Sequence, residues 1–368
     1  MIRPNAREIF VGGDSYVNLS SNDYLSLSFH PELVARSREW AKDWGAGSGA
    51  SRLITGNLDC FEKIETKIAT LKGTERALIL GSGYQANATL LQALFDRNVL
   101  SAEPQIFTDR LNHNSMHFGC QAAQVRQKRY RHLDYDHLEE LLAVSEPDQP
   151  RFILTESVFS MDGDICDMER ISTIGGGYEA FVICDDAHAT GILGVGGKGL
   201  SQGAHCVMGT FSKALGSFGA YVACSETVYD FLVNRCGGLI YSTALPPSVL
   251  GSIDAALDML PELDQERRKV ADLAATFRNE LKALGFDVGN SRSQIVPVMV
   301  GEPDQALDLS QYLRLNGFWV TAIRPPTVPQ GSSRLRFAFT AALEKSDVES
   351  CLNLIENWSK KNRNPVES

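Results

Sequence analysis

The stretch GTFSKALGSFGAY, residues 209–221, places one lysine, Lys213, among small and hydroxyl-bearing residues and directly after an apolar run. A lysine withdrawn from water loses its proton more easily, which suits a side chain that forms a Schiff base with an aldehyde. Taken alone, a lysine in such a stretch is more often a surface residue. The hypothesis that Lys213 binds an aldehyde cofactor covalently therefore needs support from other residues.

Pyridoxal 5′-phosphate is such a cofactor, and it makes several demands that the sequence can meet. Its ring nitrogen must stay protonated for the ring to act as an electron sink, which requires a carboxylate such as Asp185 at a predicted strand end. Its phosphate requires backbone N–H groups at a helix start together with hydroxyl groups. Gly83 and Tyr84 open an expected helix, YQANATLLQAL, and Thr210 lies three residues before Lys213.

Two demands remain, a flat partner for the ring and a donor for its phenolic oxygen. His113 can meet the first, and His188 and Ser160 are available for the second. Each residue also has an ordinary structural explanation, since His113 can be a loop histidine and Asp185 can cap a turn. The joint occurrence of all these groups at successive strand ends is what favours a cofactor site.

The elements that must position these residues are short apolar strands alternating with helical patterns. Amphipathic helices are predicted at 31–44 and 58–73, and a further helix at 246–260. Strands are predicted at 77–81, 105–109, 151–157, 180–186, 206–211 and 220–225. Apolar strands separated by helices indicate a largely parallel sheet covered on both faces, and ligands bind beyond the carboxyl ends of such strands.

The pattern changes from about residue 263. A long helix at 264–284 precedes the strands QIVPVMV, FWVTAI and RLRFAFT, and a helix near 344–360 follows them. Arg334 and Arg336 alternate with apolar residues in RLRFAFT, which by itself indicates a solvated strand face. We therefore expect an α/β protein with an N-terminal segment (1–28), a large cofactor-binding domain (29–252) and a small C-terminal α/β domain (253–368).

Length and composition limit the class of protein. A chain of 368 residues is too long for one compact core, and 43% hydrophobic with 22% charged residues is typical of a soluble protein. The net charge of −10, without a basic stripe, argues against nucleic-acid binding. No apolar run approaches the roughly 20 residues of a membrane span, and MIRPNAREIF lacks the apolar core of a signal peptide.

The eight cysteines are scattered and form no C-x-x-C pair. Several lie in apolar runs such as FVICDDAH, so we expect buried, reduced thiols in a cytoplasmic protein and no zinc site. No metal is expected at DDAH either, because no further ligand cluster has suitable spacing. The run GVGGKG, residues 194–199, matches a dinucleotide fingerprint literally, but it neither leaves a strand directly nor opens a helix. A flexible glycine turn explains that run better.

At this point the chain resembles the α-oxoamine synthases, which are pyridoxal-phosphate enzymes of the aspartate-aminotransferase fold type, fold type I. The matching segments extend over nearly the whole chain: NLSSNDYLSLS, GAGSGASRLITGN, SGYQAN, LNHNS, TESVFSMDGD, DDAHATG, TFSKALGSFG, IYSTALPP and WVTAIRPPTVPQGSSRLRFAFTAA. The last segment is the most informative, because relatives differ in their substrates in this lobe. Within this family, the chain is most similar to the branch that makes 8-amino-7-oxononanoate in biotin biosynthesis.

The resemblance implies a role for each matching residue. Lys213 forms the internal aldimine, His113 stacks on the cofactor ring and hydrogen-bonds the reacting substrate, and Asp185 pairs with the ring nitrogen. His188 and Ser160 approach the phenolic oxygen, while Thr210 and the amides of Gly83 and Tyr84 bind the phosphate. Substrate contacts are implied for Arg336 at the amino-acid carboxylate, for Asn22 beside it and for Thr327 toward the acyl group. Ser242 and Thr243 are implied to reach the phosphate of a partner subunit in an obligate homodimer.

The implied reaction condenses L-alanine with a pimeloyl thioester, on coenzyme A or acyl carrier protein, and releases carbon dioxide and the thiol. Family members usually carry a helical extension before the segment matching AREIF, with an arginine that contacts the acyl substrate. Here that region offers Arg3 and Arg7, so either the start is shorter or the acyl group is held differently.

Other functions stay open at the level of sequence. Within the family they are 2-amino-3-ketobutyrate ligase, 5-aminolevulinate synthase and serine palmitoyltransferase, because a one-methylene difference between amino acids is worth only about 1–3 kcal/mol. A non-catalytic partner subunit is opposed by the presence of both Lys213 and Asp185. The hypothesis of a nicotinamide-dependent dehydrogenase is supported by GVGGKG alone.

Overall fold

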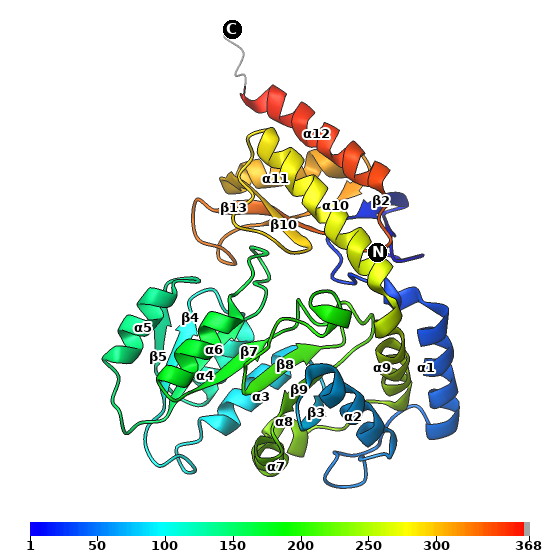
Figure 1. The fold of residues 1–368 in the computed structure, drawn as a ribbon. Helices are drawn as coiled ribbons and strands as arrows, with labels where there is room; N and C mark the ends of the chain where they lie inside the picture. The colour runs from blue at the N-terminus through cyan, green and yellow to red at the C-terminus, as the bar shows by residue number, and fades with distance from the viewer. Residues whose placement is uncertain (364–368) are drawn as a thin grey trace. The chain divides into compact units, whose positions relative to one another are not determined.

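The computed structural model describes residues 1–363, which fall into two compact units, each treated by itself below (Figure 1). The larger unit consists of His30–Phe159 and Cys166–Glu262. The smaller unit consists of Met1–Phe29, Ser160–Ile165 and the chain from Leu263 onwards. The domain limits predicted from the sequence, 1–28, 29–252 and 253–368, stay a prediction.

The larger unit is built on a seven-stranded sheet in the order β3-β9-β8-β7-β6-β4-β5. In that order the strands are Arg76–Leu80, Ala220–Cys224, Cys206–Thr210, Ala180–Asp185, Arg151–Glu156, Gln105–Asp109 and Gln127–Tyr130. All neighbours pair in parallel except β9, which is antiparallel to both β3 and β8. The expected largely parallel sheet is therefore confirmed.

The strand β5 was not predicted. Its residues QKRY are mostly polar, and only Tyr130 among them is buried. An edge strand has one neighbour and needs little apolar surface, so the hydrophobic pattern that identifies central strands is missing here.

Helices cover both faces of this sheet. They are α1 Pro31–Trp44, α2 Cys60–Lys72, α3 Gly83–Leu94, α4 Asn114–Ala122, α5 Tyr135–Ala143, α6 Met168–Gly177, α7 Glu226–Arg235, α8 Gly237–Ile240 and α9 Pro247–Met259. Neighbouring strand residues point to opposite faces. Phe152 and Ile183 join the core formed with α3 and α4, whereas Ile153 and Val182 join the core formed with α5 and α6. Burial on both faces explains why the strands are apolar almost throughout.

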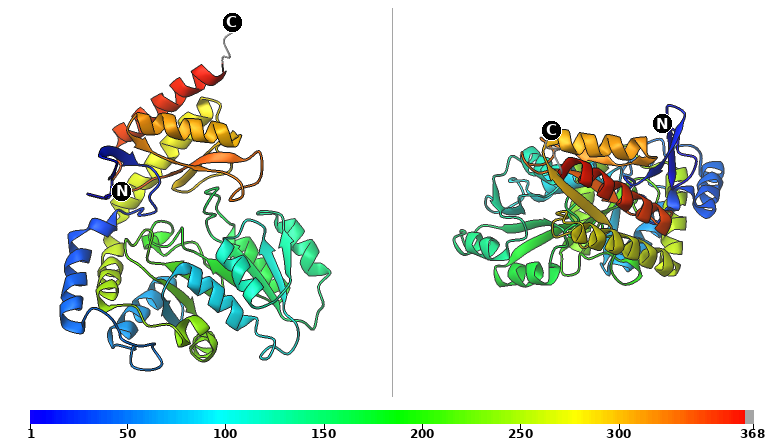
Figure 2. Two further views of the ribbon diagram at one scale, coloured as in Figure 1. Left: turned by 180° about the vertical axis from the view of Figure 1, so that it is seen from behind. Right: turned by 90° about the horizontal axis from the view of Figure 1, so that it is seen from above.

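The smaller unit contains two three-stranded sheets and three long helices. One sheet has the order β10-β13-β12, with strands Ile295–Gly301, Ser333–Ala338 and Thr321–Ile323, and the other has the order β1-β2-β11, with strands Glu8–Val11, Asp14–Asn18 and Phe318–Trp319. The helices are α10 Asp264–Ala283, α11 Pro303–Leu315 and α12 Lys345–Arg363. The view from above in Figure 2 shows α12 lying between α10 and α11. A short 3-10 helix lies at Leu27–Phe29 in this unit, and two more lie at Val195–Gly197 and Leu260–Glu262 in the larger unit.

The prediction of a single strand for FWVTAI is wrong. Phe318–Trp319 pairs in parallel with β2, and Thr321–Ile323 pairs antiparallel with β13, so the segment crosses from one sheet to the other at the buried Val320. A continuous apolar run cannot reveal such a change of partner, because both halves keep the composition of a strand.

All eight cysteines are free and buried, as their apolar surroundings predicted. Within residues 1–363, no helix combines the length and the apolar character needed to cross a membrane.

Candidate active site

A pocket of about 170 Å³ lies in the larger unit at the carboxyl ends of the central strands. It brings together seven of the predicted residues: Gly83, Tyr84, His113, Asp185, His188, Thr210 and Lys213. It also contains residues that were not predicted: Asn87, Ser115, Glu156, Ala187, Met208 and Ser212. Predicted residues from four of the strand ends thus meet in this pocket, whereas Ser160, predicted at a fifth, does not line it.

Lys213 lies in the loop between β8 and β9, and its Nζ is 2.8 Å from Nε2 of His188. The residues that follow, Ala214 and Leu215, are completely buried and anchor the loop in the core. The loop closes through a hydrogen bond from the Ser217 N–H to the Phe211 carbonyl at 2.9 Å. These contacts hold a primary amine next to an imidazole inside the pocket.

Asp185 is the last residue of β7 and is only 5% exposed. One carboxylate oxygen accepts from the Ala187 N–H at 3.0 Å, and the other accepts from Nδ2 of Asn87 at 2.8 Å. Asn87 lies one helical turn after Gly83 on α3, so the helix start and the carboxylate are joined by one hydrogen bond. The arrangement presents a buried, oriented anion to the pocket.

Glu156 is the last residue of β6 and is directly in register with Asp185 on β7. Burial raises the pKa of the Glu156 carboxyl well above its ordinary value, and the charge of Asp185 raises it further. Lys213 and the N–H of His113, which donates to Glu156, oppose this rise only in part. Its position at the end of the predicted strand RFILTES was the signal that could have identified it.

His113 is the N-cap residue of α4, and its Nδ1 lies 2.7 Å from Oγ of Ser115. Burial lowers the pKa of the His113 imidazole; the charge of Lys213 lowers it further and that of Asp185 opposes the decrease. A ring with a lowered pKa is uncharged at neutral pH, as an aromatic stacking partner should be.

The phosphate-binding end predicted from the sequence is the start of α3. Gly83 and Tyr84 are its first two residues, and the N-cap Ser82 accepts from the Gln85 N–H at 3.2 Å. The first N–H groups of a helix have no acceptor within the helix and attract anions. Thr210 adds a hydroxyl group that lies 2.7 Å from Oγ of Ser212.

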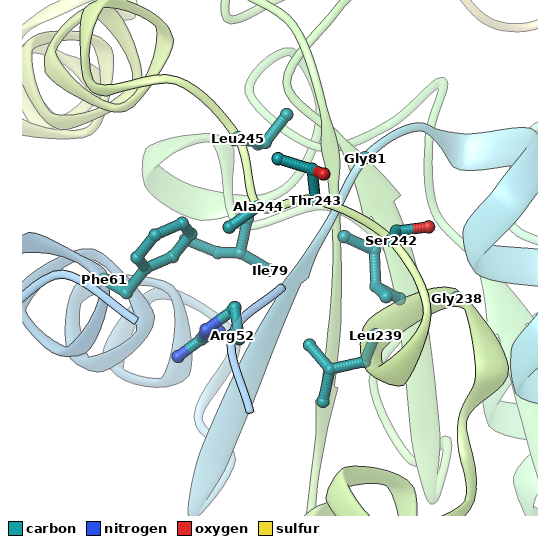
Figure 3. A pocket seen from close by; sticks show the side chains of 11 residues that line it. Arg52, Phe61, Ile79, Gly81, Gly238, Leu239, Ser242, Thr243, Ala244 and Leu245 are labelled. Atoms are coloured by element: carbon teal, nitrogen blue, oxygen red, sulfur yellow. The ribbon is translucent and has the colours of Figure 1, made fainter. Parts of the chain in front are cut away.

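Ser242 and Thr243 do not line this pocket. They line a separate small cavity with Arg52, Phe61 and Leu245, shown in Figure 3. Oγ of Ser242 accepts from Nε2 of Gln85 at 2.6 Å, and Thr243 forms a β-bridge with Ser51. The loop is therefore tied to the first turn of α3, although its hydroxyl groups lie outside the pocket of the same chain.

In the smaller unit, Arg334 and Arg336 are 4% and 7% exposed, so the interpretation of their alternation as a solvated strand face is wrong. Arg334 forms an ion pair with Asp162 at 2.5 Å. Arg336 donates from Nε to the Ser160 carbonyl at 2.5 Å and from Nη2 to Oδ1 of Asn22 at 3.1 Å. Within residues 1–363, no carboxylate pairs with Arg336. A buried guanidinium bonded only to neutral oxygens is suited to binding a carboxylate ligand.

The structure thus groups Asn22, Ser160 and Arg336 in the smaller unit. Thr327 is exposed and lies in the loop after the cis peptide bond between Pro325 and Pro326. Its N–H donates to the Arg324 carbonyl at 3.0 Å, and no described contact links it to Arg336.

The residues of the pocket that contains Lys213 fit pyridoxal phosphate. Lys213 supplies an amine, Asp185 supplies an anion, and the start of α3 supplies free N–H groups. In addition, Oδ1 of Asn87 is buried without a hydrogen-bond partner among the described residues, although Nδ2 of the same side chain is bonded. A buried polar atom without a partner is costly, so a bound polar group is expected to satisfy it.

Comparisons with known proteins agree with this fit. The chain matches the family of class I and II aminotransferases over residues 14–355. It is 53% identical to 8-amino-7-oxononanoate synthase of Gluconacetobacter diazotrophicus, over 94% of this chain and 88% of that protein.

Two solved structures extend the comparison. A lysine-to-alanine variant of serine palmitoyltransferase from S. paucimobilis, with a bound PLP–myriocin aldimine, has a TM-score of 0.92 at 25% identity, over 98% of this chain and 91% of that one. 8-Amino-7-oxononanoate synthase from Francisella tularensis has a TM-score of 0.81 at 25% identity, over 95% and 99% of the two chains. The similarity covers nearly the whole chain in each case.

Proposed function

The chain belongs to the class I and II aminotransferase family, and within it to the α-oxoamine synthases, and from this membership we propose its substrates. It condenses L-alanine with a pimeloyl thioester, carried by coenzyme A or acyl carrier protein, and gives 8-amino-7-oxononanoate, carbon dioxide and free thiol. The enzyme is a pyridoxal-phosphate-dependent acyltransferase, and the reaction belongs to biotin biosynthesis in the cytoplasm. The name shared by relatives at about half identity supports this choice of substrates.

One observation carries the proposal. In the larger unit, Nζ of Lys213 lies 2.8 Å from Nε2 of His188, in a pocket that also contains the buried carboxylate of Asp185. When bound at Lys213, pyridoxal phosphate supplies an electron sink for the negative charge left by removal of a substrate proton. An amine, an imidazole and an anion in one pocket are the protein groups that this chemistry requires.

Asp185 holds the proton on the pyridine nitrogen. Its two hydrogen bonds, from Ala187 and Asn87, fix the orientation of the carboxylate. His113 would stack on the ring face, and His188 and Ser160 would donate to the phenolic oxygen.

Once its amine is free of the cofactor, Lys213 would be the base that removes the proton from Cα of the amino acid, and the same amine would return a proton to the product. General-base catalysis typically contributes about 10²- to 10⁴-fold, so most of the acceleration must come from the sink that Asp185 maintains. His188, in hydrogen-bond contact with the amine, orients Lys213 for both transfers.

Arg336 binds the carboxylate of the amino acid through a forked contact. Asn22 orients the guanidinium from one side and the Ser160 carbonyl from another. Thr327 extends toward the acyl substrate.

The phosphate is held by the amides of Gly83 and Tyr84 and by the Thr210 hydroxyl. Ser242 and Thr243 serve the phosphate of a partner subunit in a homodimer. Their position outside the pocket of their own chain supports that assignment.

A substrate panel tests the proposal. Purified enzyme is assayed with alanine, glycine and serine against acetyl, pimeloyl and palmitoyl thioesters, and carbon dioxide and thiol are measured together. The proposal predicts the highest kcat/KM for alanine with the pimeloyl thioester. Preference for glycine with an acetyl thioester, or for serine with a palmitoyl thioester, would contradict it.

A further inference from the structure

The glycine-rich run GVGGKG closes over a buried ion pair. Gly199, the last residue of the run, has φ +86°, and a Cβ atom at this position would overlap Oδ2 of Asp186 and contact Nζ of Lys72. The run ends there because only glycine allows this backbone geometry and this close approach. The loop is thus fixed at this point rather than free, and what it covers is the pair Lys72–Asp186.

The Asp186 carboxylate is fully buried and is bonded to three other segments and to its own turn. It pairs with Lys72 of α2 at 2.5 Å and accepts from the Thr190 hydroxyl at 2.9 Å. It also accepts from the Ser157 hydroxyl at 2.5 Å and from the Leu200 N–H at 3.0 Å. Every one of these segments contacts the same side chain, so its position is strongly determined.

Lys72 is held equally firmly. Its side chain is 1% exposed, and Nζ lies 2.8 Å from the Thr190 hydroxyl and 2.5 Å from the Lys198 carbonyl. Burial lowers the pKa of the Lys72 ammonium, but the charge of Asp186 and the nearby Tyr221 hydroxyl group raise it more, so the pKa lies above its ordinary value. The Lys72 ammonium therefore stays charged at neutral pH, and neither Lys72 nor Asp186 lines the pocket of Lys213.

Asp186 lies directly between two pocket residues. Asp185 precedes it at the end of β7, and successive strand side chains point to opposite faces, so an anchored Asp186 directs Asp185 into the pocket. The backbone carbonyl of Asp186 accepts from the N–H groups of Ala189 and Thr190, at 3.1 and 2.9 Å. These bonds close the turn that carries His188.

We propose that Lys72 and Asp186 are positioning residues, which hold the turn Asp186–Thr190 so that Asp185 and His188 face Lys213. The inference rests on the proposed function for the roles of Asp185 and His188. It assigns to this pair a contribution to the rate that is separate from its contribution to stability.

The test compares Lys72→Met with Arg36→Met, which removes a partner of another buried carboxylate in the same unit, the Asp254 of α9. Lys72→Met removes the cation that pairs with Asp186, whereas Asp254 keeps Lys63 and Lys67 after Arg36→Met, so both changes should lower stability and the first should lower it more. Hydrogen exchange is measured on the cofactor-free proteins. We expect the amides of 186–190 to exchange about tenfold faster or more in Lys72→Met, and within about twofold of wild type in Arg36→Met.

Kinetics on the loaded enzyme give a second readout. Lys72→Met should lower kcat about tenfold or more and change KM for the amino acid by less than about threefold, because substrate binding is assigned to Arg336. The double variant Lys72→Met/Asp186→Leu removes both charges and should recover stability while kcat stays low. Wild-type exchange at 186–190 together with wild-type kcat, in Lys72→Met or in the double variant, would overturn the proposal.

Thr190→Val covers the case in which Lys72→Met does not fold. It removes one hydroxyl contact with each member of the pair and leaves no unpaired charge, so the same changes are expected in smaller size. Unchanged exchange at 186–190 and unchanged kcat would then count against the proposal. Because exchange is measured without cofactor or substrate, its outcome is independent of whether the substrates are assigned correctly.

Discussion

Glu156 and Asp185 are direct neighbours in register on the parallel strands β6 and β7, and both side chains line the pocket that contains Lys213. Two carboxyl groups this close cannot both be charged without cost, and the pKa of Glu156 is the one that lies well above its ordinary value, through burial first and through Asp185 second. Glu156 therefore keeps its proton, and its neighbour Asp185 is the carboxylate that we propose for the ring nitrogen of the cofactor.

The protonated Glu156 predicts how stability depends on pH. Below about pH 4.5, the carboxyl is protonated in both the folded and the unfolded chain and has no effect. Above that pH the unfolded chain releases the proton and the folded chain retains it, so stability is lost as pH rises toward the folded pKa. Each pH unit in this window costs about 1.4 kcal/mol.

Glu156→Gln imitates the protonated form and should remove this loss. The cofactor-free variant is expected to unfold at higher guanidinium concentration than wild type at pH 8 and at a nearly equal concentration at pH 4.5. Glu169→Gln, which changes an exposed carboxyl on α6, is the control and should follow wild type throughout. A constant difference between wild type and Glu156→Gln across this range would show that Glu156 is ionised in the folded protein.

Arg336→Ala should weaken binding of the amino acid far more than binding of the thioester. Loss of a charge-assisted, forked contact predicts an increase in KM for the amino acid on the order of a hundredfold. Arg334→Ala is the matched control, because that arginine already has Asp162 as its partner. Equal effects of Arg336→Ala on both substrates would contradict a role in carboxylate binding.

The contrast between these arginines shows where sequence reasoning stops. Both occupy alternate positions of one strand, and their separate partners come from loops that only tertiary structure brings to the strand. Lys213, Asp185 and His113 could be predicted because each follows a recognisable strand. Glu156 lay next to the end of a predicted strand too. Two carboxyl groups buried side by side are unusual, however, and the role of Glu156 depends on its register with Asp185.

Asp185→Asn should retain the cofactor and lose most of the rate. The amide keeps the size of the side chain but removes the charge that holds a proton on the ring, and we expect a decrease in kcat of roughly 10²- to 10³-fold, the scale of one lost electrostatic contact in the transition state. Cofactor content is measured by absorbance alongside kcat. A variant with full cofactor and a nearly normal rate would show that the ring nitrogen does not depend on Asp185.

Two inactive variants should restore activity when they are refolded or coexpressed together, if the active sites are shared between subunits. Lys213→Ala supplies an intact Ser242–Thr243 loop, and a variant with Ser242→Ala and Thr243→Val supplies an intact Lys213. Random pairing makes half of the dimers mixed, each with one complete site, which predicts about a quarter of the wild-type activity. A mixture no more active than the mean of its two components would contradict a shared site.

The most direct test is to locate the covalent attachment of the cofactor. The holoprotein is treated with borohydride, digested and mapped by mass spectrometry, with Lys213→Ala treated in parallel. We predict a pyridoxyl group on Lys213 in the wild type, and neither this group nor the absorption of the lysine-bound cofactor in the variant. A pyridoxyl group on another lysine, or on none, would contradict the account.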